Sequence, residues 1–365
     1  MKITKPTLIL DEKKCRHNIR KMAEKAREHH LAFRPHFKTH QSRKIGEWFR
    51  EEGVNAITVS SVDMAIYFAA VGWNDITIAF PVNICELEKI DRLAEKINLI
   101  VLIESIEVLK TLNKSLSNHA GVFIKIDTGY HRTGILYDHL DELDKLMREF
   151  RHTTEVKFRG FLTHAGNSYS ASSTDEIISI HEDSIKKLSK LKQRYKKEFP
   201  DCIISIGDTP CCSVATEFDG VDEIRPGNFV FYDVMQYYMG SCKLENIAVI
   251  VACPIVSVHP ERNEIVIYGG STHFSKEYIL RNNEKIFGLV ASFNGKGWKM
   301  ENEQIFVSSL TQEHGIIKGS EDYIKKIKPG DIIGVLPIHS CLTANLMKSY
   351  ITLEDDKLDY CQITN

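Results

Sequence analysis

Two histidines flank a lysine near the start of the chain, and this group of residues could support covalent chemistry. Lys38 lies in the segment RPHFKTH at positions 34–40. A lysine amine is a nucleophile only when it is neutral, and its ordinary pKa is about 10.4. Partial burial and cationic neighbours lower that pKa, and Arg34, His36 and His40 are the candidate sources of positive charge. The segment therefore predicts a reactive lysine, while a solvated surface lysine is the competing interpretation.

A histidine and a cysteine two positions apart form a second candidate. His339 and Cys341 lie in the segment PIHSCLTANL at positions 337–346. On an extended chain, residues i and i+2 point to one face. An imidazole with a thiolate suits zinc, whereas an imidazole with a carboxylate would admit harder ions. Two protein ligands would leave open positions for water and a substrate oxygen, as a catalytic metal requires, but the same pair would also fit an ordinary protein core.

Further polar segments follow predicted strands in the first two thirds of the chain. They are DTGYHRTG at 127–134, THAGNSY at 163–169, GDTP at 207–210 and RPGN at 225–228. A barrel enzyme carries its active site at the C-terminal ends of its strands and commonly holds phosphate in the loops after strands seven and eight. Glycines let backbone N–H groups approach a phosphate, and a threonine hydroxyl adds a donor. These segments would therefore meet at one face of a barrel.

An alternation of strands and helices must position these segments. Apolar runs predict strands at 31–34, 56–60, 75–80, 98–103, 122–126, 157–162, 203–206 and 223–225. Helical patterns occupy 44–50, 62–71, 85–96, 106–116, 140–150 and 176–197, and the connection 209–221 has room for a brief helix. Eight strands with seven crossovers favour an α/β fold of the (β/α)8 barrel type. A doubly wound sheet is the main competitor, but no Gly-rich dinucleotide loop follows any strand.

The pattern changes near Gly240, which predicts a second domain. Runs typical of strands occupy 248–258, 264–268, 304–310 and 331–336, and turn residues separate them. We therefore expect a barrel domain over residues 12–240 and a C-terminal, mostly β domain over 241–365. The first residues predict a strand at 7–11 and a helix at 12–30.

The composition is that of an ordinary soluble protein. The 365-residue chain is 43% hydrophobic and 26% charged, and its net charge of −2 provides no electrostatic reason to expect nucleic acid. No apolar run reaches the roughly 18 residues that a membrane span requires, and the N-terminus lacks a signal pattern. Nine scattered cysteines without a Cys-x-x-Cys pair suit the reducing cytoplasm.

The motifs together resemble the fold-type III, alanine-racemase-like enzymes that use pyridoxal 5'-phosphate (PLP), and especially the D-threonine aldolase and D-serine dehydratase family. That branch has a Pro-His-x-Lys-Thr-His motif, which positions 35–40 match. The resemblance extends from about Thr7 to Asn365. It implies a PLP barrel followed by a β domain that the N-terminal strand, residues 1–11, joins.

The resemblance also implies roles for individual residues. Lys38 would carry PLP as a Schiff base with His36 beside it, and Arg132 would lie near the cofactor's phenolic oxygen and the substrate carboxylate, which a planar guanidinium can hold with two hydrogen bonds. His164 would pack beside the pyridine ring and Tyr169 would approach its nitrogen. The remaining roles are a phosphate cup of Gly207, Thr209, Gly227 and Asn228, a site lining of Tyr232 and Gln236, and metal ligation by His339 and Cys341.

The implied function is a PLP- and divalent-metal-dependent lyase that acts on D-3-hydroxy amino acids. Cys341, where other members have Asp, favours zinc over manganese or magnesium and favours dehydration over aldol cleavage. The segment YGGS at 268–271 departs from the Asp-Ala-Gly type expected in aldolases. The alternatives are an amino-acid racemase or epimerase, which needs a second base such as a tyrosine from the β domain, and a non-catalytic PLP-binding protein. The resemblance further implies a homodimer in which one β domain completes the partner's barrel.

Overall fold

The computed structural model describes residues 2–295 and 297–361, which form two compact units. The barrel unit runs from Arg20 to Gly227. The β unit combines the N-terminal residues up to Ile19 with the chain from Asn228 onward. Helix α1 (Glu12–Glu28) begins in the β unit and ends in the barrel unit. Each unit is described by itself below.

The barrel unit contains a parallel sheet with the strand order β2-β10-β9-β8-β6-β5-β4-β3, and the short strand β7 pairs with β6. The strands are β2 (Ala32–Phe33), β3 (Ile57–Val59), β4 (Asp75–Pro81), β5 (Asn98–Ile103), β6 (Ala120–Asp127), β7 (Ile135–Leu136), β8 (Val156–Leu162), β9 (Ile203–Ile206) and β10 (Glu223–Ile224). The expected α/β barrel is therefore confirmed, with every one of its eight expected strands present.

The segment that carries Lys38 closes this barrel. Beyond the end of β2, His36 forms an isolated parallel bridge with Thr58 in β3. The Phe37 N–H donates to the Thr58 carbonyl over 2.8 Å, and the Thr58 N–H donates to the Pro35 carbonyl over 2.9 Å. The last edge of the sheet is thereby paired, and the backbone next to Lys38 is held by strand hydrogen bonds rather than by a loop.

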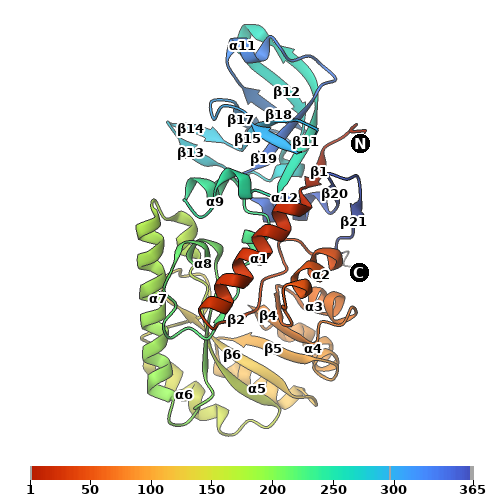
Figure 1. Ribbon diagram of the computed structural model, residues 1–365. Coiled ribbons are helices and arrows are strands. Elements are labelled where there is room, and N and C mark those ends of the chain that lie inside the picture. The colour runs from red at the N-terminus through yellow and green to blue at the C-terminus, as the bar shows by residue number, and fades with distance from the viewer. Residues whose placement is uncertain (1, 296, 362–365) are drawn as a thin grey trace. The chain divides into compact units, whose positions relative to one another are not determined.

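Helices surround the strands of the barrel unit in Figure 1. They are α2 (Arg43–Glu51), α3 (Val62–Ala69), η1 (Ile84–Glu86), α4 (Leu87–Ala94), α5 (Ile106–Ser115), α6 (Leu140–Phe150), η2 (Gly166–Ser170), α7 (Thr174–Tyr195) and α8 (Thr209–Val214). Serine caps begin several of them; the Ser42 hydroxyl, for example, accepts from the Ile45 N–H at the start of α2. The connection after β9 contains only the six-residue α8, as expected from its length.

An aromatic cluster holds the segment that carries Lys38. The ring of Phe37 packs against Phe49, Phe68 and Trp73, with centroid separations of 4.9, 5.0 and 5.1 Å. Phe37 is fully buried. Because the residue before Lys38 is anchored in this core, the lysine is presented from a rigid position.

The β unit is built on an antiparallel sheet that includes the N-terminal strand. Strand β1 pairs antiparallel with β11 and parallel with β20. The strands are β1 (Thr7–Leu10), β11 (Val249–His259), β12 (Glu264–Tyr268), β13 (Ile279–Arg281), β14 (Glu284–Ile286), β15 (Gly288–Phe293), β16 (Trp298–Met300), β17 (Phe306–Leu310), β18 (His314–Lys318), β19 (Ile332–Pro337), β20 (Tyr350–Thr352) and β21 (Lys357–Leu358). The helices are η3 (Asn228–Val230), α9 (Val234–Tyr238), η4 (Leu244–Asn246), η5 (Pro260–Arg262), α10 (Ser271–Phe274), α11 (Glu321–Ile324) and α12 (Ser340–Met347).

Several strands of the β unit were not anticipated. The hairpin of β13 and β14 turns at Asn282 and Asn283, whose φ angles are 48° and 65°. Two consecutive residues with positive φ make the turn type that two-residue hairpins prefer, so the Asn-Asn pair was a readable signal. The other missed strands are mostly short, and an alternating pattern over three residues has little statistical weight.

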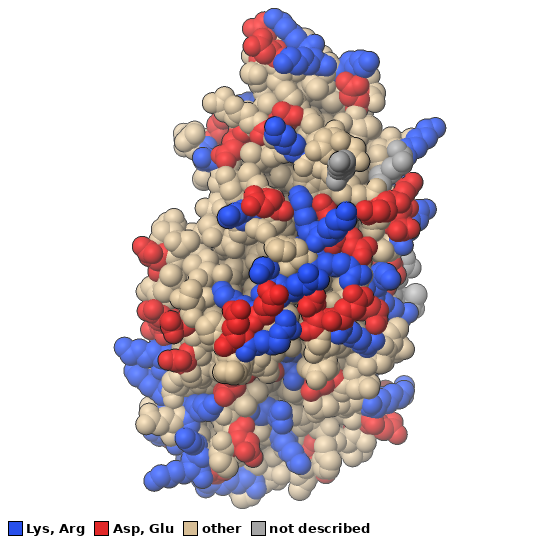
Figure 2. Space-filling view, viewed as in Figure 1, with Lys and Arg blue, Asp and Glu red and all other residues tan. Residues whose placement is uncertain are grey.

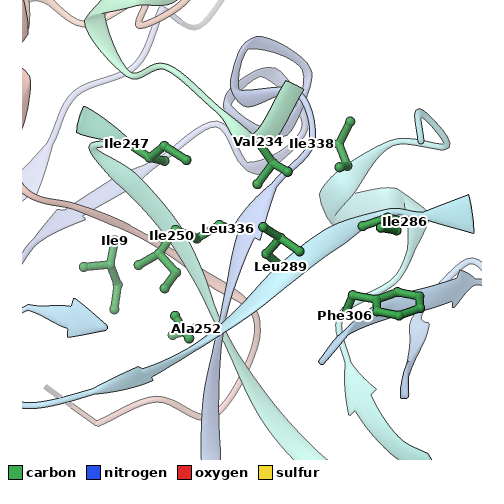
Figure 3. Close-up of a cluster of buried hydrophobic side chains, with 11 residues drawn as sticks. Ile9, Val234, Ile247, Ile250, Ala252, Ile286, Leu289, Phe306, Leu336 and Ile338 are labelled. Carbon is green, nitrogen blue, oxygen red and sulfur yellow. The ribbon is translucent and has the colours of Figure 1, made fainter. Parts of the chain in front are cut away.

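One hydrophobic cluster of the β unit anchors the segments that matter for chemistry. Val234 and Ile338 both belong to it, with Ile9, Leu289 and Leu336 among its other members, and Figure 3 shows them converging. Val234 follows Asp233 directly, and Ile338 precedes His339 directly. The backbones of these two segments are thereby fixed against one core.

The surface shows no field of one charge sign on the face drawn in Figure 2. Lysine and arginine side chains alternate there with aspartate and glutamate, in keeping with the net charge of −2. Among the described residues, no helix combines the length and the apolar character needed to cross a bilayer.

Candidate active site

Lys38 is exposed, directly beyond the bridge that closes the barrel. Its backbone N–H donates to His36 Nδ1 over 3.3 Å, and its carbonyl accepts from Gln41 Nε2 over 3.0 Å. The sequence-based expectation of a partly buried lysine is therefore not met within the barrel unit. The amine stands at the C-terminal ends of the strands, which is the face where barrel enzymes work.

Two imidazoles beside Lys38 are held in the neutral form. Burial lowers the pKa of His36 well below its usual value, and the positive charges of Lys38 and Arg225 lower it further. Burial and the charge of Lys38 likewise lower the pKa of His164. His164 Nδ1 lies 2.6 Å from the Gly207 carbonyl oxygen. Since a carbonyl can only accept, Nδ1 carries the proton and Nε2 has the lone pair.

The expectation that Arg34, His36 and His40 supply positive charge to the lysine is corrected by these contacts. Arg34 is buried and forms ion pairs with Asp75 and with Glu223, the latter over 2.6 Å. His40 is buried and its Nδ1 accepts from the Ser42 N–H over 3.1 Å, so that nitrogen is unprotonated. Two carboxylates thus balance the positive charge of Arg34, and His36 carries no charge. Neither residue supplies a net positive charge to the lysine.

Arg132 joins the same group of residues through a tyrosine. Its guanidinium carbon lies 5.0 Å from the ring centroid of Tyr130, and that ring meets His164 edge-on at 5.9 Å. Asp127 fixes the turn because its Oδ1 accepts from the Gly129 N–H over 2.8 Å and from two further backbone N–H groups. The exposed Arg132 can therefore reach an anionic substrate group at the barrel mouth.

Tyr169 lies on the other side of His164, with ring centroids 6.1 Å apart. Its hydroxyl oxygen accepts from the Thr209 N–H over 3.2 Å. The family resemblance implied that Tyr169 approaches the pyridine nitrogen and that Thr209 belongs to the phosphate cup. In this structure the hydroxyl and the backbone N–H bind one another, so the tyrosine connects η2 to the first turn of α8.

The two glycines expected in the phosphate cup allow close backbone packing. A Cβ on Gly227 would lie 2.9 Å from the His36 carbonyl oxygen, and one on Gly207 would lie 2.8 Å from Arg225 Cβ. Both contacts are shorter than real Cβ atoms show, so these positions require glycine. The loop after β9 therefore packs closely against Arg225, and the loop after β10 packs closely against the lysine segment.

Two buried cations of this region were missed as functional candidates. Lys125 lies at the end of β6; burial and the charges of Arg225 and Arg132 lower its pKa to about 7. Arg225 Nη2 donates to the Thr163 carbonyl over 2.7 Å, and burial lowers its pKa to about 10. The available signal was a lysine in the apolar run FIKID at 123–127, since isolated charges in strand interiors are rare.

In the β unit, His339 and Cys341 are brought together, but not by an extended chain. His339 has an extended backbone (φ −133°, ψ 101°), whereas Cys341 lies in the first turn of helix α12. The sequence-based expectation of an extended i, i+2 pair is therefore wrong. The two side chains nevertheless form a hydrogen bond with one another, because the chain turns into the helix between them.

Neighbouring groups orient both members of this pair. His339 Nδ1 lies 2.5 Å from Glu277 Oε2, and Asn228 Nδ2 lies 3.5 Å from Cys341 Sγ. Burial lowers the pKa of His339, but the hydrogen bonds to Cys341 and Glu277 outweigh burial and raise the pKa well above its usual value. Both partners of the imidazole therefore favour its charged form over its neutral form.

Asp233 connects the two segments around the pair. Its Oδ2 accepts from Asn228 Nδ2 over 2.6 Å and from the Ser340 N–H over 2.9 Å, and its Oδ1 accepts from the Gln236 N–H over 3.0 Å. The side chain of Asn228, expected in the phosphate cup, is thus directed to Asp233 and Cys341. Tyr232, expected to line the cofactor site, has a φ of 48° and packs on the hydrophobic cluster of Figure 3.

The donor set around His339 and Cys341 fits a zinc ion. The described residues contain no group of three or more His, Cys, Asp or Glu side chains arranged to hold a metal. A metal here would therefore use the imidazole and the thiolate and fill its remaining positions with water or substrate. Asn228 Oδ1, the Gln236 amide and Thr343 Oγ are buried and have no partner among the described residues, which leaves polar atoms for ordered water or ligand.

Comparisons with known proteins show the family to which this chain belongs. The family model described as alanine racemase, N-terminal domain matches residues 10–234, and a model for a serine dehydratase domain matches residues 248–353. D-serine dehydratase of Dictyostelium discoideum is 32% identical over 96% of this chain and 93% of its own length. D-threo-3-hydroxyaspartate dehydratase of Delftia sp. (strain HT23) is 25% identical over 96% of this chain and 94% of its own length. The solved structure of a cysteine-to-alanine mutant of D-threo-3-hydroxyaspartate dehydratase, in the metal-free form, has a TM-score of 0.91 and 23% identity over 98% of this chain and 97% of that one.

Proposed function

We propose, from the premise that this chain belongs to the alanine racemase N-terminal domain family, that it is a PLP- and divalent-metal-dependent lyase of D-3-hydroxy amino acids. A dehydratase of the D-serine type is the favoured activity. The observation that carries the proposal is the hydrogen-bonded pair of His339 and Cys341 within the stretch that matches a serine dehydratase domain. A racemase would have no use for such a pair.

Lys38 is the residue that would hold PLP covalently. Its exposed amine stands beside two neutral imidazoles, and the neutral form of His164 lets the ring lie against an aromatic cofactor without a competing charge. Arg225 and the glycines at 207 and 227 shape the adjoining loops. When bound, PLP draws electrons away from the bonds of the substrate's α-carbon.

His339 and Cys341 are the residues that would hold the metal. A thiolate with an imidazole selects zinc, whereas manganese or magnesium would prefer oxygen ligands. When bound, zinc acts as a Lewis acid on the β-hydroxyl oxygen of the substrate. Asn228 and Glu277 orient the two ligands, as second partners do in metal sites generally.

The chain's own residues then decide the reaction. Arg132 binds the substrate carboxylate with its planar guanidinium. The released amine of Lys38 takes the proton from the α-carbon, and the β-hydroxyl leaves with a proton as water. Hydrolysis returns that water, so D-serine becomes pyruvate and ammonia. If the hydroxyl proton were removed instead, the bond between the α- and β-carbons would break, and D-threonine would become glycine and acetaldehyde.

A product assay tests the proposal. The purified protein is loaded with PLP and zinc and incubated with D-serine or D-threonine, with and without chelator, and products are identified by mass spectrometry. Pyruvate from D-serine and 2-oxobutanoate from D-threonine, both lost on chelation, are the expected result. Acetaldehyde and glycine would indicate the aldolase instead. Inversion at the α-carbon that is indifferent to chelator would overturn the lyase in favour of a racemase.

We further propose a homodimer in the cytoplasm. Lys38 lies in the barrel unit and Cys341 in the β unit, so the reaction requires a barrel unit to meet a β unit, and the family resemblance assigns these to different chains. All nine cysteines lie in the described part of the chain and are thiols, which suits a reducing compartment. The domain limits of 12–240 and 241–365, with residues 1–11 joining the second domain, stay a prediction that limited proteolysis can test.

A further inference from the structure

We infer that Glu277 is a positioning residue that fixes the imidazole of His339 so that its Nε2 atom is the metal ligand. The inference rests on the proposed metal pair and adds a residue from a distant part of the chain. Glu277 lies in the segment between α10 and β13, 62 positions from His339.

The distance between the two groups determines which nitrogen is available. Glu277 Oε2 lies 2.5 Å from His339 Nδ1. An ionised carboxylate can only accept hydrogen bonds, so Nδ1 must carry the proton that is shared. The other ring nitrogen, Nε2, is then the one left for a metal ion, and the imidazole also has a side-chain hydrogen bond with Cys341.

The segment that carries Glu277 is held in a defined conformation. Ser275 has a φ of 72°, and its hydroxyl accepts from the Glu277 N–H over 3.2 Å. Just beyond, Ile279 pairs with Ile286, and both pack in or against the hydrophobic cluster of Figure 3. Since Ile338 belongs to the same cluster, the carboxylate and the imidazole are both anchored to one core.

The short distance distinguishes this contact from an ordinary surface pair. The side chain of His339 is 23% exposed and that of Glu277 is 43% exposed. A second pair of the β unit, His259 and Glu261, has its Nδ1 and Oε1 atoms 3.4 Å apart, with the histidine 30% exposed and the glutamate 64% exposed. Carboxylate–histidine–metal arrangements of the first kind hold the tautomer and raise the basicity of the ligand nitrogen.

The inference is tested on the full-length protein with zinc and cobalt as the probes. Zinc affinity is measured by competition with a chelator for the wild type, Glu277→Ala, Glu277→Gln and the matched control Glu261→Gln. Glu277→Ala is expected to weaken zinc roughly 10- to 100-fold. Glu277→Gln keeps an acceptor for the Nδ1 proton and should lose less zinc affinity than Glu277→Ala. Glu261→Gln should bind zinc as tightly as the wild type does.

Cobalt spectra and thermal melting separate positioning from a general structural defect. At saturating cobalt, the thiolate charge-transfer band should persist in Glu277→Ala, while the ligand-field bands shift and the apo-protein melts at the wild-type temperature. Equal zinc affinity in the wild type and both Glu277 variants would overturn this inference and leave the metal pair intact. A wild type that binds no zinc would overturn the proposed metal site and this inference together.

Discussion

The Nδ1 atom of His164 lies 2.6 Å from the carbonyl oxygen of Gly207, and this contact determines the tautomer of the imidazole beside Lys38. The proton is on Nδ1, so Nε2 can accept a hydrogen bond from a ligand but cannot donate one while the ring is neutral. Because Gly207 is also the first residue of a loop expected to hold phosphate, one contact couples the ring orientation to the cofactor loop.

Replacing Lys38 should abolish both covalent PLP binding and catalysis. Lys38→Ala removes the amine that would hold the cofactor and accept the α-proton, so turnover of D-serine should fall by roughly 10³-fold or more. Visible absorbance of the purified protein reports the cofactor, and pyruvate formation reports the activity. Lys110→Ala, at an exposed lysine paired with Glu149, serves as the control and should behave as the wild type. Full activity in Lys38→Ala would refute the assignment.

Protonation of the two neutral imidazoles should destabilise the protein in acid. The pKa values of His36 and His164 are lowered in the fold, so below the ordinary value of about 6.5 the unfolded chain binds more protons. Stability is therefore present above that pH and is lost as the pH falls, by up to about 1.4 kcal/mol per pH unit for each histidine. Urea unfolding between pH 7 and 5 measures the slope, which should be shallower in His36→Gln.

Asp233 should increase both the stability of the β unit and its affinity for the metal. Asp233→Asn replaces one acceptor oxygen by a donor that faces the donors of Asn228 and Ser340. Leaving a buried polar group unsatisfied costs about 1–3 kcal/mol, and zinc should bind more weakly because the segment that carries His339 loses its anchor. Denaturant unfolding and chelator competition measure the two effects. Asp322→Asn, in the exposed first turn of α11, is the control, and identical losses there would argue against a specific role.

Exchanging the thiolate for a carboxylate should change the preferred metal. Cys341→Asp offers an oxygen ligand, so zinc affinity should fall while manganese affinity rises. The cobalt-loaded variant should also lack the thiolate charge-transfer band that the wild type shows. Cys85→Ala removes an exposed cysteine of the barrel unit and should change neither property. An unaltered cobalt spectrum in Cys341→Asp would exclude Cys341 as a ligand.

Mixed dimers distinguish a site within one chain from a site shared between chains. Lys38→Ala and Cys341→Ala are each expected to be inactive. After unfolding and refolding together, a shared site would return about a quarter of the wild-type activity, because half of the dimers are mixed and each has one complete site. Sites confined to single chains would return none. The separately refolded variants, mixed afterwards, are the control.

The sequence by itself determined the parts that depend on local pattern. Periodic apolar runs located the barrel strands to within a few residues, since a buried parallel strand must be apolar along its length. The motif around Lys38 and the residues that end the strands were readable because a barrel brings all strand ends to one face. The Asn282–Asn283 turn was readable too, although it was overlooked.

The tertiary structure decided how side chains far apart in the chain act on one another. Asp75 and Glu223 balance the charge of Arg34, which no local pattern predicts, and the buried cations near His164 are Lys125 and Arg225. The partner of His339 lies 62 positions away, and Cys341 faces it because a helix begins at Ser340. Hydrogen bonds and charge interactions act over a few ångströms in space, whatever the separation along the chain, so their partners emerge only when the fold has brought them together.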